Sequence, residues 1–184
     1  MKKAPFNQLA LAPAGVDVER RDDGVIILTS KVSVPEAPRA VGVWLEHWAA
    51  RTPDATFLAE RADGGTGDWI RLSYDEALAS ARAVGQALLD RGLGPSRPVM
   101  ILSNNSLAQA RLTLGALHVG VPIVPVSPAY SLLSQDFAKL RHIVGLTIPG
   151  LVFAESGGPY ERALKAVDFG DTEVVVVSDP LPGA

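Results

Sequence analysis

The sequence predicts an α/β fold, in which a doubly wound, mainly parallel sheet is flanked by helices and preceded by an N-terminal β-hairpin extension. From Ser73 onward, segments with helical periodicity alternate with short apolar segments, the order in which chains build a parallel sheet covered by helices. The apolar segments at 97–102, 150–154 and 172–179 show little of the polar alternation of a half-exposed strand, which indicates strands covered on both faces.

Two antiparallel hairpins are predicted before this alternating part begins. The stretch "VDVERRDDGVIILTS" (16–30) places two β-prone runs around Asp23-Gly24, a strong turn signal. A helix is expected over residues 41–50, and the runs "TFLAER" and "WIRLS" form the second hairpin. We therefore divide the chain into an extension, residues 1–38, and an α/β subdomain, residues 39–184.

Short polar patterns set the starts and ends of the first two helices of the alternating part. Ser73 and Glu76 form a capping box, and Ser106 and Gln109 form a second one. Gly92 is expected to end the first of these helices. Further helices are predicted over residues 134–144 and 158–167.

The predicted strand at 122–126 contains Pro122 and Pro125. Proline has no N–H to donate to a sheet ladder, so Pro125 predicts an edge-like or irregular second half. The strand at 172–179 is followed by no helical segment and is expected at a bare or one-sided edge. We therefore expect the sequence to be a truncated part of a larger fold.

Composition excludes several classes of function. The chain has no cysteine among its 184 residues, which excludes disulfides, thiol nucleophiles and cysteine-based zinc sites. A net charge of -3 gives no reason to expect nucleic acid or an anionic membrane as a partner. The N-terminus lacks the apolar run of a signal peptide, so a cytoplasmic location is expected.

No catalytic or metal-binding motif is evident. The three histidines, His47, His118 and His142, are far apart and form no H-E-x-x-H pattern. The sequence also lacks G-x-S-x-G and G-x-G-x-x-G. The glycine-rich "DGGTGDW" contains no lysine and precedes a strand, which favours a hairpin turn over a phosphate loop.

Two turns follow predicted parallel strands, where open α/β sheets bind their ligands. One is "SPAYS" (127–131), and the other is "ESGGPYER" (155–162), where Gly157 and Gly158 permit close backbone approach and Arg162 can face an anion. A rigid connector and an ordinary helix cap are the alternative interpretations of the two turns.

Three segments, in order, resemble the N-terminal part of the acyl-adenylating (AMP-binding) superfamily. They are "LSYDEAL" (72–78), "VMILSNNSLAQARLTLGALHVGVPIVPVSPAYS" (99–131) and "LRHIVGLTIPGLVFAE" (140–155). The stretches "WLEHWAARTPDATFLAER" and "VSPAYSLLSQDFAKLR" are most similar to the feruloyl-CoA synthetase branch, whose members join hydroxycinnamic acids to coenzyme A.

The resemblance implies a reaction in two steps that uses ATP, Mg²⁺ and coenzyme A. None of the residues present matches the superfamily's phosphate loop or its later catalytic motifs. This implies that the chain is an inactive N-terminal fragment, without cofactors of its own, whose partners are the remainder of its own chain and a small aromatic acid. The alternative is a self-contained α/β domain that binds a ligand or a partner without catalysis.

Relatives of the acetyl-CoA synthetase type line the site for the nucleotide end of coenzyme A with two turns. Carried over to this sequence by motif, these turns imply contacts from Ser127, Tyr130, Gly157, Gly158 and Arg162. The glycine-rich form of the first turn is replaced here by Pro-Ala-Tyr.

Overall fold

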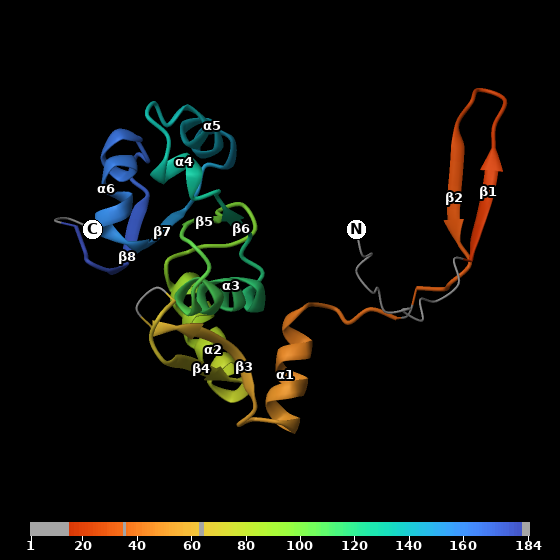
Figure 1. Cartoon of the computed structure of the whole chain (residues 1–184), viewed down its shortest axis with the longest axis horizontal. Helices are drawn as coiled ribbons and strands as arrows, with labels where there is room; N and C mark the ends of the chain where they lie inside the picture. Colours follow the sequence, from red (N-terminus) through yellow and green to blue (C-terminus); the bar gives the residue numbers. More distant parts are fainter. Residues whose placement is uncertain (1–14, 35, 63–64, 182–184) are drawn as a thin grey trace, which may run out of the picture. The chain divides into compact units, whose positions relative to one another are not determined.

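The computed structural model describes residues 15–34, 36–62 and 65–181, and the chain divides into two compact units, residues 1–37 and 38–184. In the first unit, β1 (Val16–Arg20) pairs antiparallel with β2 (Ile26–Ser30) (Figure 1). Gly24 has a φ of 85° in the turn between them, a conformation that glycine adopts without strain. The predicted first hairpin is confirmed.

The second unit begins with a helix and an antiparallel hairpin and continues with alternating helices and strands. In chain order its elements are α1 (Gly42–Arg51), β3 (Thr56–Arg61), β4 (Trp69–Ser73), α2 (Tyr74–Asp90), β5 (Val99–Leu102), α3 (Leu107–Val119), β6 (Ile123–Pro125), α4 (Ala129–Leu132), α5 (Ala138–Thr147), β7 (Leu151–Ser156), α6 (Gly157–Ala166) and β8 (Glu173–Ser178). Within the described residues, no helix is both long and apolar enough to cross a membrane.

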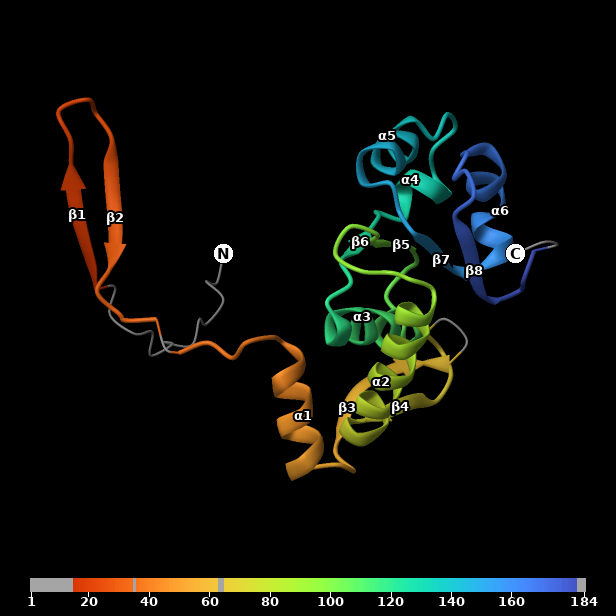
Figure 2. The same ribbon diagram turned by 180° about the vertical axis from the view of Figure 1, so that it is seen from behind.

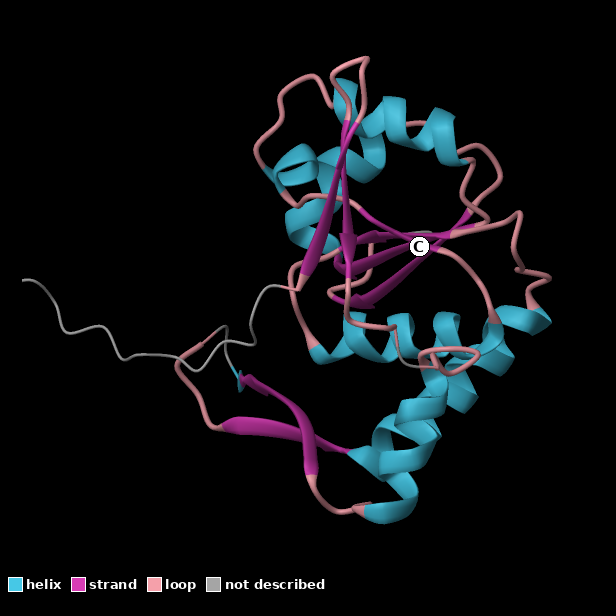
Figure 3. Cartoon of the chain, turned by 90° about the vertical axis from the view of Figure 1, so that its right-hand side faces the viewer, coloured by secondary structure: helices cyan, strands magenta, loops and turns pink. Residues whose placement is uncertain are grey.

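The strands β6, β5, β7 and β8 lie in this order in one parallel sheet. Val99 and Ile101 of β5 pack with α2 and α3 on one face, whereas Met100 and Leu102 pack with α5 and α6 on the other. Figures 2 and 3 show these helices on opposite sides of the strands. The doubly wound α/β fold predicted from the sequence is confirmed.

The start of α2 is the capping box that the sequence predicts. The Ser73 hydroxyl accepts a hydrogen bond from the backbone N–H of Glu76, and the Glu76 carboxylate accepts one from the N–H of Ser73. The hydrogen bond from the Ser73 N–H lowers the pKa of the Glu76 carboxyl below its ordinary value. The predicted end is also confirmed, because Gly92 follows the helix with a φ of 67°.

Helices α2 and α3 approach each other closely at two glycines. A Cβ atom placed on Gly115 of α3 would lie 2.5 Å from Cγ1 of Val84, and one on Gly85 of α2 would lie 2.7 Å from Cγ1 of Val119. Neither contact is possible unless the valine side chains or the helices shift. The absence of side chains at these two positions therefore sets the helix separation beside the sheet.

The position of Pro125 explains how a strand tolerates proline. The Val126 N–H donates to the Ile101 carbonyl, and the Pro122 carbonyl accepts from the Val99 N–H, so the even-numbered residues of this strand bond with β5. Pro125 lies between two of these bonded residues, so its backbone nitrogen points away from β5. On that side the described residues add no further strand, and no N–H is needed there. The edge-like strand predicted from Pro125 is confirmed, and β8, half-buried, forms the opposite edge.

The prediction of a helix starting at residue 134 is wrong by several residues. The Ser134 hydroxyl accepts from the Phe137 N–H, and the Asp136 carboxylate accepts from the Ala138 N–H, so these side chains form a turn and α5 begins at Ala138. The bond from the Ala138 N–H lowers the pKa of Asp136, and a hydrogen bond that the Ser134 hydroxyl donates to the same carboxylate lowers it further. The short helix α4 was not predicted.

Candidate functional site

The order of the strands defines a switch point in the sheet. The chain passes from β5 to β6 on one side and then returns to β7 on the other side of β5. In open parallel sheets, ligands bind outside the carboxyl ends of the strands where the order reverses in this way. Here that position lies between the ends of β5 and β7.

Two side chains meet at this position. Ser103 directly follows β5, and its hydroxyl lies 3.0 Å from an oxygen of the Glu155 carboxylate in β7 and 2.6 Å from the Asn104 carbonyl. Ser103 is buried, with 6% of its surface exposed. Its hydroxyl therefore joins the two central strands at their carboxyl ends.

A third polar group, Tyr160, is affected by the charge of Glu155. Burial raises the pKa of the Tyr160 phenol in α6, and the negative charge of Glu155 raises it further. Tyr160 is 2% exposed, and its hydroxyl has no hydrogen-bond partner among the described residues. The phenol is therefore held in its neutral form close to the Glu155 carboxylate.

A pocket of about 370 Å³ opens beside Ser103, between the ends of β5 and β6. Hydroxyl and carboxamide side chains make up its polar lining, together with two prolines and a valine: Ser103, Asn104, Asn105, Gln109, Pro125, Val126, Ser127 and Pro128. The described residues that line it carry no charge, so the pocket is suited to a neutral group that donates and accepts hydrogen bonds.

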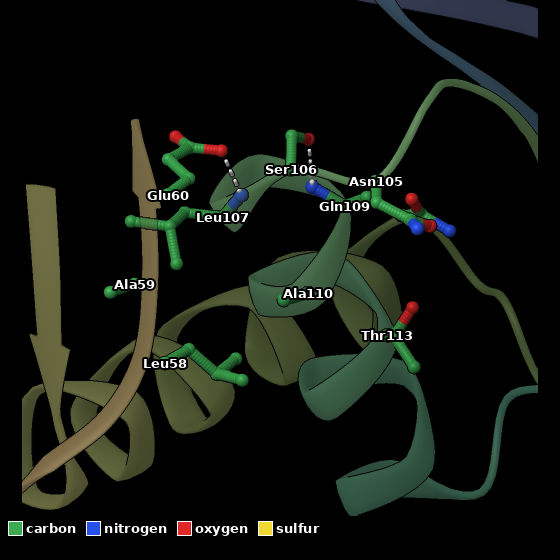
Figure 4. Close-up of a pocket in the computed structure, with 9 residues that line it drawn as sticks. All are labelled: Leu58, Ala59, Glu60, Asn105, Ser106, Leu107, Gln109, Ala110 and Thr113. Atoms are coloured by element: carbon green, nitrogen blue, oxygen red, sulfur yellow. Dashed lines mark hydrogen bonds between the residues drawn. The ribbon is translucent and has the colours of Figure 1, made fainter. Parts of the chain in front are cut away.

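A second pocket, of about 330 Å³, lies between β3 and the first turns of α3 (Figure 4). The Glu60 carboxylate accepts a hydrogen bond of 2.8 Å from the Leu107 N–H, and the Ser106 hydroxyl accepts one of 3.1 Å from the Gln109 N–H. Two of the N–H groups at the start of α3 are thus bonded within the protein. Asn105 and Gln109 line both pockets and connect them.

The structure separates Ser127 from Tyr130. Ser127 is exposed and lines the pocket beside Ser103. Tyr130 lies on α4 and lines a different pocket, of about 410 Å³, formed with α5. Residues of the 127–131 turn therefore line two neighbouring cavities.

The second predicted turn is occupied by another part of the chain. The Gly158 N–H donates to the Asp179 carboxylate at 2.9 Å, and a Cβ on Gly157 would lie 2.0 Å from the Asp179 carbonyl oxygen. The close backbone approach that the two glycines permit is thus an approach of the segment after β8. An internal carboxylate fills the start of α6.

Arg162 extends along α6 toward the turn before α5. Its guanidinium donates to the Gln135 side chain at 3.1 Å and lies 5.8 Å from the centre of the Phe137 ring. The five predicted residues therefore line separate places and do not converge on one pocket. Their contact with coenzyme A remains a prediction.

Sequence reasoning did not identify Ser103 and Glu155 as a pair. The sequence shows that each follows a run of buried apolar residues, but the strand order is needed to place β5 beside β7. The predicted cap at Ser106 is found, but a capping pattern carries no sign of the pocket that Asn104 and Asn105 line. Among the described residues, no group of three histidine, aspartate or glutamate side chains could hold a metal ion.

One family of known proteins matches most of the chain. The sequence pattern of the family described as "AMP-binding enzyme" matches residues 45–183, which include the whole sheet. Residues of the chain are 27% identical over 135 positions to CymA of Salinispora arenicola, assigned as a probable nonribosomal peptide synthetase, covering 73% of the chain and 2% of CymA.

Solved structures share the fold. A fatty acyl-adenylate ligase of L. pneumophila superposes with a TM-score of 0.58 at 18% identity, covering 77% of the chain and 23% of that protein. A protein of Rhodopseudomonas palustris assigned as a putative long-chain-fatty-acid CoA ligase superposes with a TM-score of 0.61 at 22% identity. The match covers 78% of the chain and 34% of that protein. The chain spans about a third or less of the length of these proteins.

Proposed function

Since the chain belongs to the AMP-binding enzyme family, we propose that it supplies the N-terminal α/β unit of an ATP-dependent acid ligase that acts through an acyl-adenylate. The observation that supports this most is the family match over residues 45–183, which covers the sheet, the Ser103–Glu155 pair and the pocket beside it.

The proposed reaction has two steps. A carboxylate oxygen of the acid attacks the α-phosphorus of ATP, and the bond from that phosphorus to the bridging oxygen breaks to release pyrophosphate. The sulfur of a thiol then attacks the acyl carbon, the thiol proton is lost, and AMP leaves. Mg²⁺ would offset the charge of the phosphates. The residues that hold it would come from the remainder of the same chain, which is the partner we propose.

We further propose an aromatic acid of the hydroxycinnamate type as the substrate and coenzyme A as the thiol, which would make the parent a feruloyl-CoA synthetase acting in the cytoplasm. The resemblance of residues 44–61 and 126–141 to that branch supports this proposal. The uncharged pocket beside Ser103, with its carboxamides, offers hydrogen bonds of the kind that an amide-containing thiol arm needs. In this role Ser103 and Glu155 fix the pocket wall.

ATP–pyrophosphate exchange tests the proposed function. The complete open reading frame that contains these residues should be expressed beside the 184-residue chain, and each assayed with ferulate, with a fatty acid and with an amino acid. We expect acid-dependent exchange from the complete product, strongest with ferulate, and none from the 184-residue chain. A reading frame that ends at Ala184 would favour the self-contained binding domain instead.

A further inference from the structure

The hairpin of β1 and β2 has an open edge along β2. Among the described residues the two strands form a sheet of their own, and no third strand pairs with either of them (Figure 1). A two-stranded hairpin alone in water is marginally stable, and an open edge presents unpaired backbone groups to any other strand. The outer edge of β2 is therefore a place where a further strand can add.

The hydrogen bonds at the two ends of the hairpin show which backbone groups face this edge. The Lys31 N–H donates to the Gly15 carbonyl, and the Arg21 N–H donates to the Val25 carbonyl. Since bonded and non-bonded pairs alternate in an antiparallel ladder, the odd-numbered residues of β2 bond with β1. The even-numbered residues of the strand therefore turn their N–H and carbonyl groups to the free edge: Ile26, Leu28 and Ser30.

The two edges of the hairpin differ in charge. Strand β1 carries Asp17, Glu19 and Arg20, and Asp17 pairs with Lys31 and Glu19 with Arg21, each at 2.9 Å. Strand β2, with the sequence IILTS, has no charged residue and no proline. Native proteins place charges and prolines on edge strands to prevent them from pairing with other chains. The edge of β1 is protected in this way, whereas the edge of β2 is not.

We propose that β2 pairs antiparallel with β2 of a second copy of this chain, about a two-fold axis at Leu28. In this register Leu28 lies opposite Leu28 of the second copy, and Ile26 lies opposite Ser30. Residues that face outward meet residues that face outward, so the N–H and carbonyl groups of all three find partners. The two hairpins then form one sheet of four strands.

The pairing also brings together two exposed apolar faces. Val18 and Leu28 are cross-strand neighbours on one face of the hairpin and are 55% and 67% exposed. Val16 and Ile26 lie on the same face and are exposed as well. In the four-stranded sheet the two Leu28 side chains would contact each other on this face, which removes apolar surface from water.

The other ways to pair two hairpins edge to edge are less favourable. If β1 paired with itself about Val18, Asp17 of each copy would lie opposite Glu19 of the other, and like charges directly opposite destabilise a sheet. If β1 paired with β2 of the next copy, the contact would be head-to-tail and would leave an edge open at each end. The pairing of β2 with β2 closes with two copies.

Disulfide trapping tests the register, because the chain has no cysteine of its own. Ile27→Cys and Thr29→Cys place thiols at positions that lie opposite each other across the axis. Oxidation of an equimolar mixture of these two 184-residue variants should give severalfold more disulfide-linked dimer than oxidation of either variant alone. The matched control is a mixture of Asp17→Cys and Glu19→Cys, the equivalent positions of β1, which should give no such excess.

Sedimentation velocity measures the association without a cross-link. The 184-residue chain should shift from monomer to dimer as its concentration rises. Leu28→Lys places two ammonium groups together at the axis and should keep the chain monomeric, whereas Val18→Lys, on the neighbouring strand, should still dimerise. Loss of the dimer in both variants would mean that the apolar face associates and not the edge, which would overturn the proposal.

Two further results would overturn the proposal. One is a parent chain that stays monomeric, or equal trapping in the β2 and β1 mixtures. The other is a complete gene product that is not trapped by the β2 cysteines although the 184-residue chain is, because the remainder of the chain would then cover this edge. The trapping does not depend on the ligase activity, so its failure leaves the proposed function untouched.

Discussion

The Ser103 hydroxyl and the Glu155 carboxylate lie 3.0 Å apart across the boundary between β5 and β7, although 52 residues separate them in the sequence. This contact joins the two central strands at their carboxyl ends. It also orients Ser103, which lines the uncharged pocket between β5 and β6. The order of the strands, which places β5 beside β7, thus decides how this wall of the candidate site is formed.

Removal of the Ser103 hydroxyl should destabilise the chain. Ser103→Ala leaves the half-buried Glu155 carboxylate without this donor, and we expect a loss of about 1 kcal/mol in the free energy of unfolding. A double-mutant cycle with Glu155→Ala, measured by urea denaturation, should give a coupling of about 1 kcal/mol. Ser106→Ala combined with Glu155→Ala is the control and should be additive. Additivity in both cycles would contradict the contact.

Removal of the Tyr160 hydroxyl should have the opposite effect. The hydroxyl is buried without a partner in the described structure, so Tyr160→Phe should raise the free energy of unfolding by about 1 kcal/mol at neutral pH. A lower free energy of unfolding for the variant would show that the hydroxyl has a partner, such as a buried water.

The raised pKa of Tyr160 also predicts that the free energy of unfolding depends on pH in the alkaline range. Its pKa is raised in the folded state, so the neutral phenol is favoured there. The corresponding stability is fully present below the unfolded-state pKa of about 10 and is lost as the pH rises through the folded-state pKa. The difference in free energy of unfolding between Tyr160→Phe and the parent should therefore widen above pH 10. A difference that stays constant would contradict this assignment.

The contact between α2 and α3 predicts opposite effects for two glycine substitutions. In Gly115→Ala, the new Cβ would lie 2.5 Å from Val84, and we expect a loss of about 1–3 kcal/mol despite alanine's better helix propensity. Gly145→Ala in α5 is the matched control, because nothing lies within 4 Å of its Cβ position, and it should gain about 0.5–1 kcal/mol. Equal effects in thermal or urea unfolding would refute the close approach.

The contact between Asp179 and α6 can be tested in the same way. Asp179→Ala removes the acceptor for the Gly158 N–H and should lower the free energy of unfolding by about 1 kcal/mol. Asp179→Asn keeps an acceptor and tolerates the φ of 50° at this position, so its effect should be smaller. The reverse order of the two variants would mean that the carboxylate does not cap the helix.

Local patterns in the sequence predicted most of the fold. The capping box of Ser73 and Glu76 and the turn at Asp23-Gly24 depend on residues close in sequence, and both are found in the structure. The start of α5 is predicted too early because Ser134 and Asp136 are residue types that both cap helices and form turns. The sequence does not distinguish the two roles, and the structure shows a turn.

The candidate site depends on contacts that the sequence does not encode locally. Asp179 reaches Gly158 over 21 residues, so no pattern near the glycine pair predicts that an internal carboxylate accepts from this N–H. Glu60 similarly caps α3 from a hairpin 47 residues earlier. The order of the strands decides which polar ends meet, and no pattern within one strand contains that order.

ATP–pyrophosphate exchange by the complete product of the gene tests the central claim most directly. We predict exchange that depends on an added carboxylic acid, with ferulate the most effective, and no exchange from residues 1–184 alone. An absence of exchange with every acid, in a product that is folded by circular dichroism, would contradict the assignment of these residues to an acid-activating ligase.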